Sequence, residues 1–240
     1  MISVQNISKS FGTHQILHQI NLEIPDDAHL GLVGGSGSGK SVLMKLLLGL
    51  EQADEGEIYI DGEPVSQFTP KSWPRVLNRF GVVFQGAALF DSLTILENVG
   101  IKLYENREGT PGEIEARVVE ALRKVNLGPE ILHKYPAHLS GGMRKRVGIS
   151  RAIIHDPTYI IYDEPTTGLD PVSSDIIDEL IYDLASTAGK TSIIITHDMN
   201  TVKRIATQVA MIHQRELLFN GTKDDFLASD HPSIRAFLAR

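Results

Sequence analysis

The sequence contains no cysteine among its 240 residues. This absence excludes a disulfide framework, a zinc–thiolate site, an iron–sulfur cluster and a cysteine nucleophile, and it fits a reducing compartment. The sequence also lacks any run near the ~18 consecutive apolar residues that a membrane-spanning helix needs. Its first residues carry neither the basic stretch nor the apolar core of a secretory signal. Any work at a membrane is therefore expected to depend on an integral-membrane partner.

The charge balance is acidic, with 23 Lys and Arg against 30 Asp and Glu and a net charge of −7. This balance argues against a broad nucleic-acid-binding face, and we predict no nucleic-acid partner. The one basic group, Arg144, Lys145, Arg146 and Arg151, is interpreted as a solvated helix face. Hydrophobic residues make up 42% of the chain, which predicts a core of ordinary size.

Apolar patterning predicts an α/β protein. Short apolar runs predict buried strands at His29–Val33, Thr158–Tyr162, Ser192–Thr196 and Gln208–Ile212. Apolar residues at helical spacing predict helices at Val42–Leu50, Glu113–Val125, Met143–Ile154 and Ser173–Thr187. The first quarter alternates apolar and polar residues, as Ile20, Leu22 and Ile24 do, and reads as β-rich. Strands that alternate with helices favour a parallel sheet covered by helices.

A glycine-rich loop follows the first buried strand. It reads Gly34, Gly35, Ser36, Gly37, Ser38, Gly39, Lys40 and Ser41, and it matches the phosphate-binding pattern G-x-x-x-x-G-K-[ST] at every fixed position. Its backbone N–H groups are expected to cradle phosphate oxygens at the start of a helix. Lys40 is expected to neutralise the β- and γ-phosphates, and the Ser41 hydroxyl to bind Mg²⁺. A flexible Gly/Ser loop is the structural alternative, and the flanking strand and helix disfavour it.

Two acids end a later apolar strand, at Asp163 and Glu164. Such a strand delivers its carboxylates to the edge of an α/β sheet where ligands bind. We expect Asp163 to bind Mg²⁺ and Glu164 to polarise the water that attacks the γ-phosphate. A simple turn or a helix N-cap would also place two acids here. Beside a phosphate-binding loop, however, the pair favours a nucleoside triphosphatase.

The run Leu139-Ser140-Gly141-Gly142-Met143 opens a predicted helix. It resembles the LSGGQ signature of ATP-binding-cassette ATPases, with Met143 in place of the usual glutamine. The resemblance covers the whole chain. It implies that Phe11 stacks on adenine, Gln85 touches Mg²⁺ or water, Asp170 communicates across a dimer, and His197 contacts the γ-phosphate. Many members use tyrosine at the position of Phe11, so this residue is a mild departure.

The resemblance also implies a fold and an assembly. The fold would be a P-loop NTPase (RecA-like) parallel-sheet core with an antiparallel β subdomain and an inserted α-helical signature subdomain. One cassette would span residues 1–240, with the core and β subdomain at 1–85 and 156–223, the helical subdomain at 86–155, and a helical tail at 224–240. Two copies would pair head to tail with ATP and Mg²⁺, so that Lys40 of one copy and Ser140, Gly141 and Gly142 of the other enclose each ATP.

The segment after Gln85 is more apolar than an ordinary surface loop. Exposed apolar patches often mark partner sites. In transporter ATPases this region receives a helix of the permease, and the resemblance therefore implies that Leu89 and Phe90 contact an integral-membrane permease.

Among transport ATPases, the sequence resembles the ATPase of Mla/MCE-type phospholipid transport systems. The resemblance is carried by residues 84–94, by Met143 in the signature and by the tail residues 229–238. It implies phospholipid transport from the cytoplasmic face of the inner membrane, with an MCE-domain lipid-binding protein and a small regulatory subunit as further partners. Two alternatives stay open: the ATPase of a polar amino-acid importer, and a stand-alone regulatory ATPase that is not coupled to transport.

Overall fold

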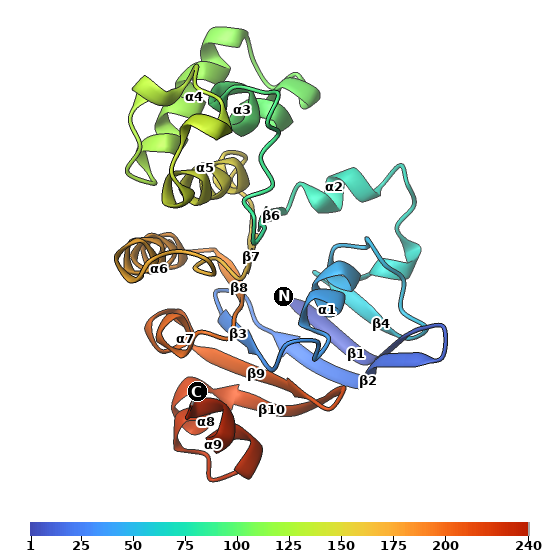
Figure 1. The fold of residues 1–240 in the computed structure, drawn as a ribbon. Helices are drawn as coiled ribbons and strands as arrows, with labels where there is room; N and C mark the ends of the chain where they lie inside the picture. Colours follow the sequence, from blue (N-terminus) through green and yellow to red (C-terminus); the bar gives the residue numbers. More distant parts are fainter. Residues whose placement is uncertain (240) are drawn as a thin grey trace. The chain divides into compact units, whose positions relative to one another are not determined.

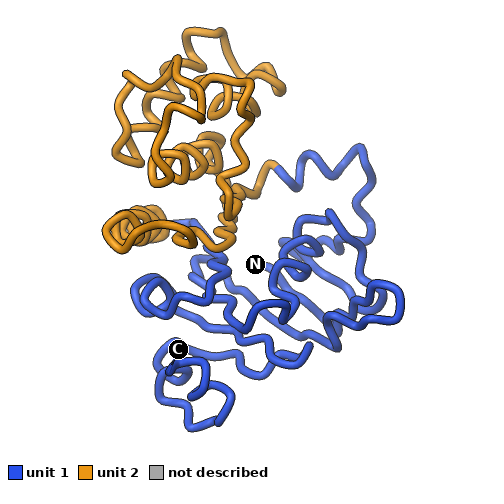
Figure 2. Tube along the Cα trace, viewed as in Figure 1, with its two compact units in different colours: residues 1–77, 187–240 blue, residues 78–186 orange. Residues whose placement is uncertain are grey.

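Residues 1–239 are described by a computed structural model, whose helices and strands are labelled in Figure 1. Their contacts group them into two units (Figure 2): residues 1–77 with 187 onward, and residues 78–186. The second unit is wider than the helical subdomain predicted at 86–155, because it also holds two strands and a helix that follows them. The predicted functional division of the chain stays a prediction.

An antiparallel sheet forms part of the first unit. It consists of β1 (Ile2–Phe11), β2 (His14–Ile24), β4 (Glu55–Ile60) and β5 (Glu63–Pro64), in the order β2-β1-β4-β5. Ile2 pairs with Ile24 on one side and with Ile60 on the other, and all three are fully buried. In β4 and the second half of β2, buried apolar residues alternate with more exposed ones, so these strands bury one face. The β-rich first quarter predicted from the alternation is confirmed, and so is the antiparallel β subdomain that the resemblance implied.

Mostly parallel strands form the other sheet region of this unit. They are β3 (His29–Val33), β8 (Thr191–Ile195), β9 (Gln208–His213) and β10 (Glu216–Thr222), in the order β10-β9-β3-β8. β3 runs parallel to both β8 and β9, and only β10 is antiparallel. Every residue of β8 is buried, as expected of a strand covered on both faces. Because Leu32 pairs with Ile195, the carboxyl ends of β3 and β8 lie side by side.

The helices of the first unit are short. They are α1 (Lys40–Leu47), α2 (Trp73–Leu77), α7 (Met199–Ile205), α8 (Lys223–Ala228) and α9 (Pro232–Leu238), with a 3₁₀ turn at Val65–Gln67. α8 and α9 lie in the tail predicted at 224–240, and they are packed into the first unit. Phe226, Ile234 and Phe237 pack with Val33 and Met211 in one buried cluster. Arg240, the last residue of the predicted tail, lies outside the described residues.

The second unit combines two parallel strands with four helices. β6 (Phe80–Val83) pairs with β7 (Tyr159–Asp163), and the helices are α3 (Ile95–Asn106), α4 (Pro111–Arg123), α5 (Gly141–Ile153) and α6 (Pro171–Ala185), with 3₁₀ turns at Pro129–Ile131 and Pro136–His138. Capping boxes begin α3 at Thr94 and α4 at Thr110. Within residues 1–239, no helix is both long enough and apolar enough to cross a membrane.

The interpretation of the basic group on α5 as a solvated face is wrong. Lys145 is only 6% exposed, and Arg151 is half-buried. Each of the four side chains donates to a backbone carbonyl, and Arg144 alone is well exposed. The four cations therefore hold neighbouring loops in place, which is a role that charge counting cannot reveal.

His155 connects the end of α5 to the start of β6. Its Nε2 lies 3.0 Å from the carbonyl oxygen of Phe80, so the neutral ring donates a hydrogen bond there. Burial, together with the positive charge of Lys102, lowers the pKa of His155 from 6.5 to about 4. The unfolded chain therefore takes up a proton between these pH values that the folded chain does not. The free energy of unfolding is therefore at its full value above pH 6.5 as far as His155 is concerned, and it decreases as the pH falls from 6.5 toward 4.

We accordingly expect acid to destabilise the wild-type protein more than a His155→Gln variant, which keeps a donor but does not titrate. Between about pH 7.5 and pH 5, the free energy of unfolding of the wild type should fall by about 2 kcal/mol more than that of the variant. Urea titrations at the two pH values measure this difference. Equal losses in both proteins would contradict the assignment to His155, since the other titrating groups are shared.

Candidate functional site

The glycine-rich loop lies between β3 and α1, as the sequence predicted. Two of its glycines are required by close contacts. Gly34 has φ 150°, and a Cβ on it would lie 2.4 Å from the carbonyl oxygen of Ile212. Gly39 has φ 106°, and its Cβ would lie 2.5 Å from Leu17 Cδ2. Larger residues would push the loop off the strands beneath it, so glycine sets its shape.

The polar groups of this loop point inward and fit a phosphate. Lys40 is 8% exposed, and its Nζ donates to the carbonyl oxygens of Gly34 at 2.9 Å and Gly35 at 3.0 Å. The N-terminus of α1 has no side-chain cap and no acid in its first turn. The buried hydroxyl of Ser38 has no hydrogen-bond partner. An inward ammonium, uncapped helix N–H groups and an orphaned hydroxyl together match an anionic ligand.

His197 follows β8 and therefore lies at the same sheet edge as the loop. The N–H of Thr196 donates to the carbonyl of Leu32 at 3.3 Å, which ties the two strand ends together. His197 is exposed. Phe11, the predicted adenine platform at the end of β1, is 46% exposed, and the Lys9 ammonium lies 5.2 Å from its ring centroid. An exposed aromatic face is available for stacking, and its role stays a prediction.

In the second unit, Gln85 and the two acids follow neighbouring strands. Val83 at the end of β6 pairs with Tyr162 at the end of β7. Gln85 and Asp163 therefore emerge from the same edge of this strand pair, where parallel strands place their ligand-binding groups. Gln85 is exposed, and Asp163 is half-buried.

Glu164 is held in an unusual conformation. Its φ of 49° lies in the left-handed region, which non-glycine residues rarely adopt. The Thr167 hydroxyl donates to Glu164 Oε2 at 3.0 Å, and the Lys145 ammonium donates to the carbonyl oxygen of Glu164 at 3.2 Å. Strained backbone that is held by several contacts is common at functional sites. The sequence did not predict Lys145 as part of this neighbourhood.

The signature run begins α5 and packs on the loop that leads into α6. Ser140 is the N-cap of α5, and its hydroxyl oxygen accepts from the N–H of Met143 at 3.2 Å. A Cβ on Gly141 would lie 3.6 Å from Leu169, so the start of α5 faces this loop with space for one further carbon atom. Asp170 caps α6 by accepting from both the N–H and the hydroxyl of Ser173, and these hydrogen bonds lower the pKa of its carboxyl. The second unit thus brings Ser140, Glu164 and Asp170 into one neighbourhood.

Side chains from α5 and α3 hydrogen-bond the backbone of the segment after Gln85, which exposes an aromatic side chain. Arg151 donates to the carbonyls of Ala87 and Ala88, each at 2.7 Å, while both alanines have positive φ. Asn98, which is fully buried, hydrogen-bonds the backbone N–H and carbonyl of Phe90 and the carbonyls of Leu93 and Thr94. Phe90 is 52% exposed, and Leu89 is partly exposed. The only sequence signal for this support was a polar asparagine on the apolar side of a helix.

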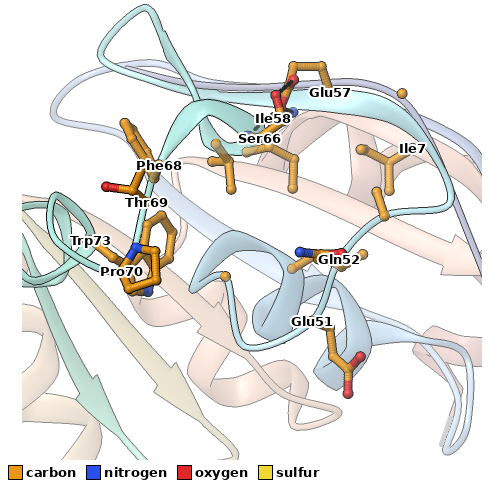
Figure 3. Close-up of a pocket in the computed structure, with 15 residues that line it drawn as sticks. Ile7, Glu51, Gln52, Glu57, Ile58, Ser66, Phe68, Thr69, Pro70 and Trp73 are labelled. Atoms are coloured by element: carbon orange, nitrogen blue, oxygen red, sulfur yellow. Dashed lines mark hydrogen bonds between the residues drawn. The ribbon is translucent and has the colours of Figure 1, made fainter.

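The first unit contains two cavities that are lined almost entirely by residues other than the predicted site residues. One, of about 610 Å³, lies between the antiparallel sheet and residues 65–73 (Figure 3). Its carboxylate Glu57 accepts from the N–H groups of Ile58 and Ser66, so it is bound within the fold, and no predicted site residue lines this cavity. The other, of about 420 Å³, is lined by Gly35 together with His213 and residues of α9, including Phe237.

The residues predicted to bind Mg²⁺ are Ser41, Gln85 and Asp163. Their hydroxyl, amide and carboxylate oxygens are donors that Mg²⁺ prefers, and a set with one carboxylate fits an ion that is bound mainly through substrate phosphates. Within the described part of the chain, no group of three or more His, Cys, Asp and Glu could hold a metal.

Comparisons with known proteins agree with these features. The family model described as "ABC transporter" matches residues 17–167. The chain is 38% identical to the "Probable ribonucleotide transport ATP-binding protein mkl" of Mycobacterium leprae (strain TN), over 99% of this chain and 68% of that protein. It is 34% identical to the Arabidopsis thaliana "Protein TRIGALACTOSYLDIACYLGLYCEROL 3, chloroplastic" (99% and 73%) and to the "Methionine import ATP-binding protein MetN 2" of Pseudomonas entomophila (strain L48) (99% and 72%).

A solved structure is similar to this chain in its fold. It is a dimeric ATP-binding cassette in a post-hydrolysis state bound to ADP and Pi, with a TM-score of 0.84 and 30% identity over 92% of this chain and 98% of that chain. The predicted P-loop NTPase fold, with its antiparallel and helical parts, is confirmed. ATP and Mg²⁺ are the cofactors of such cassettes. The chain therefore belongs to the ABC transporter family, as an ATP-hydrolysing, ATP-binding domain.

Proposed function

We propose that this chain energises phospholipid transport between membranes through a separate permease. The observation that carries the coupling to a permease is the segment of residues 87–96, defined here as the docking segment, which follows Gln85 closely and presents the exposed Phe90 on a hydrogen-bonded backbone.

In this proposal the loop of residues 34–41 binds the triphosphate of ATP. Lys40 leaves the carbonyls of Gly34 and Gly35 to meet the β- and γ-phosphates, and the N-terminus of α1 adds its partial positive charge. Glu164 polarises the attacking water, and His197 contacts the γ-phosphate. Phe11 stacks on adenine. Ser41, Gln85 and Asp163 would hold Mg²⁺, which would supply positive charge next to the phosphate oxygens.

The working unit in this proposal is a head-to-tail homodimer. A related cassette has been solved as a dimer with ADP and Pi. Each ATP is enclosed by Lys40 of one copy and by Ser140, Gly141 and Gly142 of the other. The N-terminus of α5 has no acid in its first turn, which suits it to face the γ-phosphate of the partner's ATP. Asp170, at the start of α6 beside the signature, communicates across the dimer.

The docking segment is built to receive a helix of the permease. Arg151 fixes its first two carbonyls, and Asn98 fixes the turn that presents Phe90. A large apolar side chain that stays exposed on a fixed backbone is typical of a contact hot spot, because little side-chain or backbone freedom is lost on binding. Through the permease, the chain works at the cytoplasmic face of the inner membrane.

The assignment to phospholipid rests on the Mla/MCE resemblance of residues 84–94, Met143 and residues 229–238. It is supported by 34% identity to a plant protein whose name contains a galactolipid. An MCE-domain lipid-binding protein and a small regulatory subunit are the further partners of this proposal. The same identity to a methionine importer favours a second candidate, the ATPase of a polar amino-acid importer. The mycobacterial relative is named for ribonucleotide transport.

Copurification separates these candidates. The tagged chain, extracted from its native membrane in mild detergent, should carry a permease, an MCE-domain protein and bound phospholipid. A solute-binding protein for amino acids, without lipid enrichment, would instead identify the importer. Failure to recover any integral-membrane protein would favour the stand-alone regulatory ATPase.

We expect Phe90→Asp to detach the chain from its permease. A carboxylate in an apolar interface is left desolvated without a partner, which should lower the affinity for the permease at least tenfold, on the order of the loss at a contact hot spot. The measurement is the amount of permease that copurifies with the variant. Tyr182→Asp is the matched control, because Tyr182 is 49% exposed on α6 of the same unit, close to the 52% of Phe90. Equal recovery with Phe90→Asp and wild type would contradict the docking assignment.

A further inference from the structure

Lys145 occupies an unusual place for a lysine. It is the fifth residue of α5, its side chain is only 6% exposed, and its Nζ donates to the carbonyl oxygen of Glu164 at 3.2 Å. Burial lowers the pKa of Lys145, while the nearby carboxylates of Glu164 and Asp163 favour its charged form. A cation that is buried this deeply has lost most of its hydration. The position of the Lys145 ammonium is therefore set by the protein groups around it rather than by solvent.

The contact with Glu164 acts on a strained residue. Glu164 has a φ of 49°, and its carbonyl oxygen also accepts from the N–H of Thr167 at 3.3 Å. Lys145 thus reaches the backbone of Glu164 from α5, whereas Thr167 reaches it from its own loop. Loss of the ammonium would remove the contact that reaches this backbone from α5, and the carboxylate would be less well placed.

The same helix begins at the signature. Four residues separate Ser140, the N-cap of α5, from Lys145. α5 also lies against α6, which follows the loop after Glu164. A movement of the first turn of α5 would therefore be carried along one continuous helix to Lys145 and to the carbonyl oxygen that it holds.

We propose that Lys145 is a positioning residue that couples the two ATP sites of the dimer, by linking the signature that serves the partner's ATP to the glutamate that serves the chain's own ATP. The inference rests on the head-to-tail dimer and on the role of Glu164 proposed above. When Ser140 engages the partner's ATP, α5 is fixed, and Lys145 in turn fixes Glu164. Hydrolysis at one site then depends on nucleotide at the other, which makes turnover cooperative in ATP.

The test compares Lys145→Met with Lys145→Gln in the complete complex with the permease. Methionine keeps the apolar length and removes the donor, whereas glutamine keeps an N–H donor without the charge. Initial rates over a range of ATP concentrations give kcat, the half-saturating ATP concentration and the Hill coefficient. Lys145→Met should lower kcat about tenfold and bring the Hill coefficient from above 1 to about 1, with the affinity of the isolated chain for ATP unchanged. Lys145→Gln should restore most of both losses.

Lys124→Met is the matched control, because Lys124 is 56% exposed and pairs only with Glu120 in the same helical region. Thermal unfolding of each variant checks the fold, and replacing a buried cation by an apolar side chain is often neutral for stability. An unchanged Hill coefficient in Lys145→Met, or equal losses in the methionine and glutamine variants, would overturn the coupling. A non-cooperative wild-type complex would overturn it as well.

Ser140→Arg separates this inference from the proposed function on which it rests. If Ser140→Arg abolishes turnover while Lys145→Met leaves kcat and cooperativity unchanged, the dimer stands and only the coupling through Lys145 is wrong. If the complex of Ser140→Arg hydrolyses ATP at the wild-type rate, the head-to-tail dimer itself is wrong.

Discussion

A Glu164→Gln variant should bind ATP normally and turn it over at least about a hundredfold more slowly than the wild type. Glutamine keeps the shape of the side chain and can still accept a hydrogen bond from Thr167, which lies 3.0 Å away. It lacks the carboxylate charge that would polarise the attacking water. The loss should therefore appear in kcat. Nucleotide affinity should stay unchanged, because Glu164 is not part of the glycine-rich loop that binds the phosphates.

Steady-state hydrolysis by the permease complex and equilibrium binding of labelled ATP measure the two quantities separately. Glu179→Gln, an exposed glutamate on α6, is the matched control and should keep wild-type turnover. Lys40→Ala provides the opposite pattern, because removal of the ammonium should weaken nucleotide binding itself. Near-normal hydrolysis by Glu164→Gln would exclude this residue as the group that activates water.

Ser140→Arg should abolish both ATP-dependent dimerisation and hydrolysis in the chain that carries it. The substitution places a bulky cation at the start of α5, on the face that meets the partner's ATP. Its own glycine-rich loop is untouched, so the isolated chain should keep its affinity for ATP. We expect turnover to fall at least about a hundredfold, because the donors that meet the γ-phosphate can no longer approach it.

Size-exclusion chromatography with ATP measures the dimer, and Ser186→Arg, an exposed serine at the end of α6, controls for an added cation in the same unit. A mixture of Ser140→Arg chains with Lys40→Ala chains adds a sharper test. In a mixed dimer one of the two ATP sites combines an intact loop with an intact signature, so hydrolysis should return at a single site. Normal hydrolysis by a monomeric Ser140→Arg chain would refute the shared site.

Most of the parallel core and the glycine-rich loop could be predicted from the sequence. The predicted strand at His29–Val33 coincides with β3, and the predicted strand Thr158–Tyr162 is displaced by one residue from β7. Buried parallel strands are continuous apolar runs, which makes them visible in a single sequence. The signature helix was predicted to begin at Met143 and begins at Gly141, because Ser140 caps it and glycines without side chains carry no apolar signal.

The contacts that support the site were not predictable in this way. Arg151 and Ala87 are 64 residues apart in the sequence, and the acceptor is a backbone carbonyl that every residue possesses. The same holds for Lys145 and the carbonyl of Glu164. From the sequence alone these cations were therefore interpreted as a charged surface. In the structure they form hydrogen bonds from side chain to backbone. The packing of the tail was missed for a related reason, since Phe226 and Phe237 show apolar character but not which core receives it.

Asn98 supports the backbone of the docking segment without being part of its exposed surface. Its fully buried amide holds the backbone on both sides of Phe90, and it does so from behind, without contributing to the exposed face. The side chains that a permease would contact can therefore be exchanged while the turn that presents them is retained. We therefore expect substitutions of exposed residues such as Phe90 to change the affinity for a permease while the backbone turn is kept.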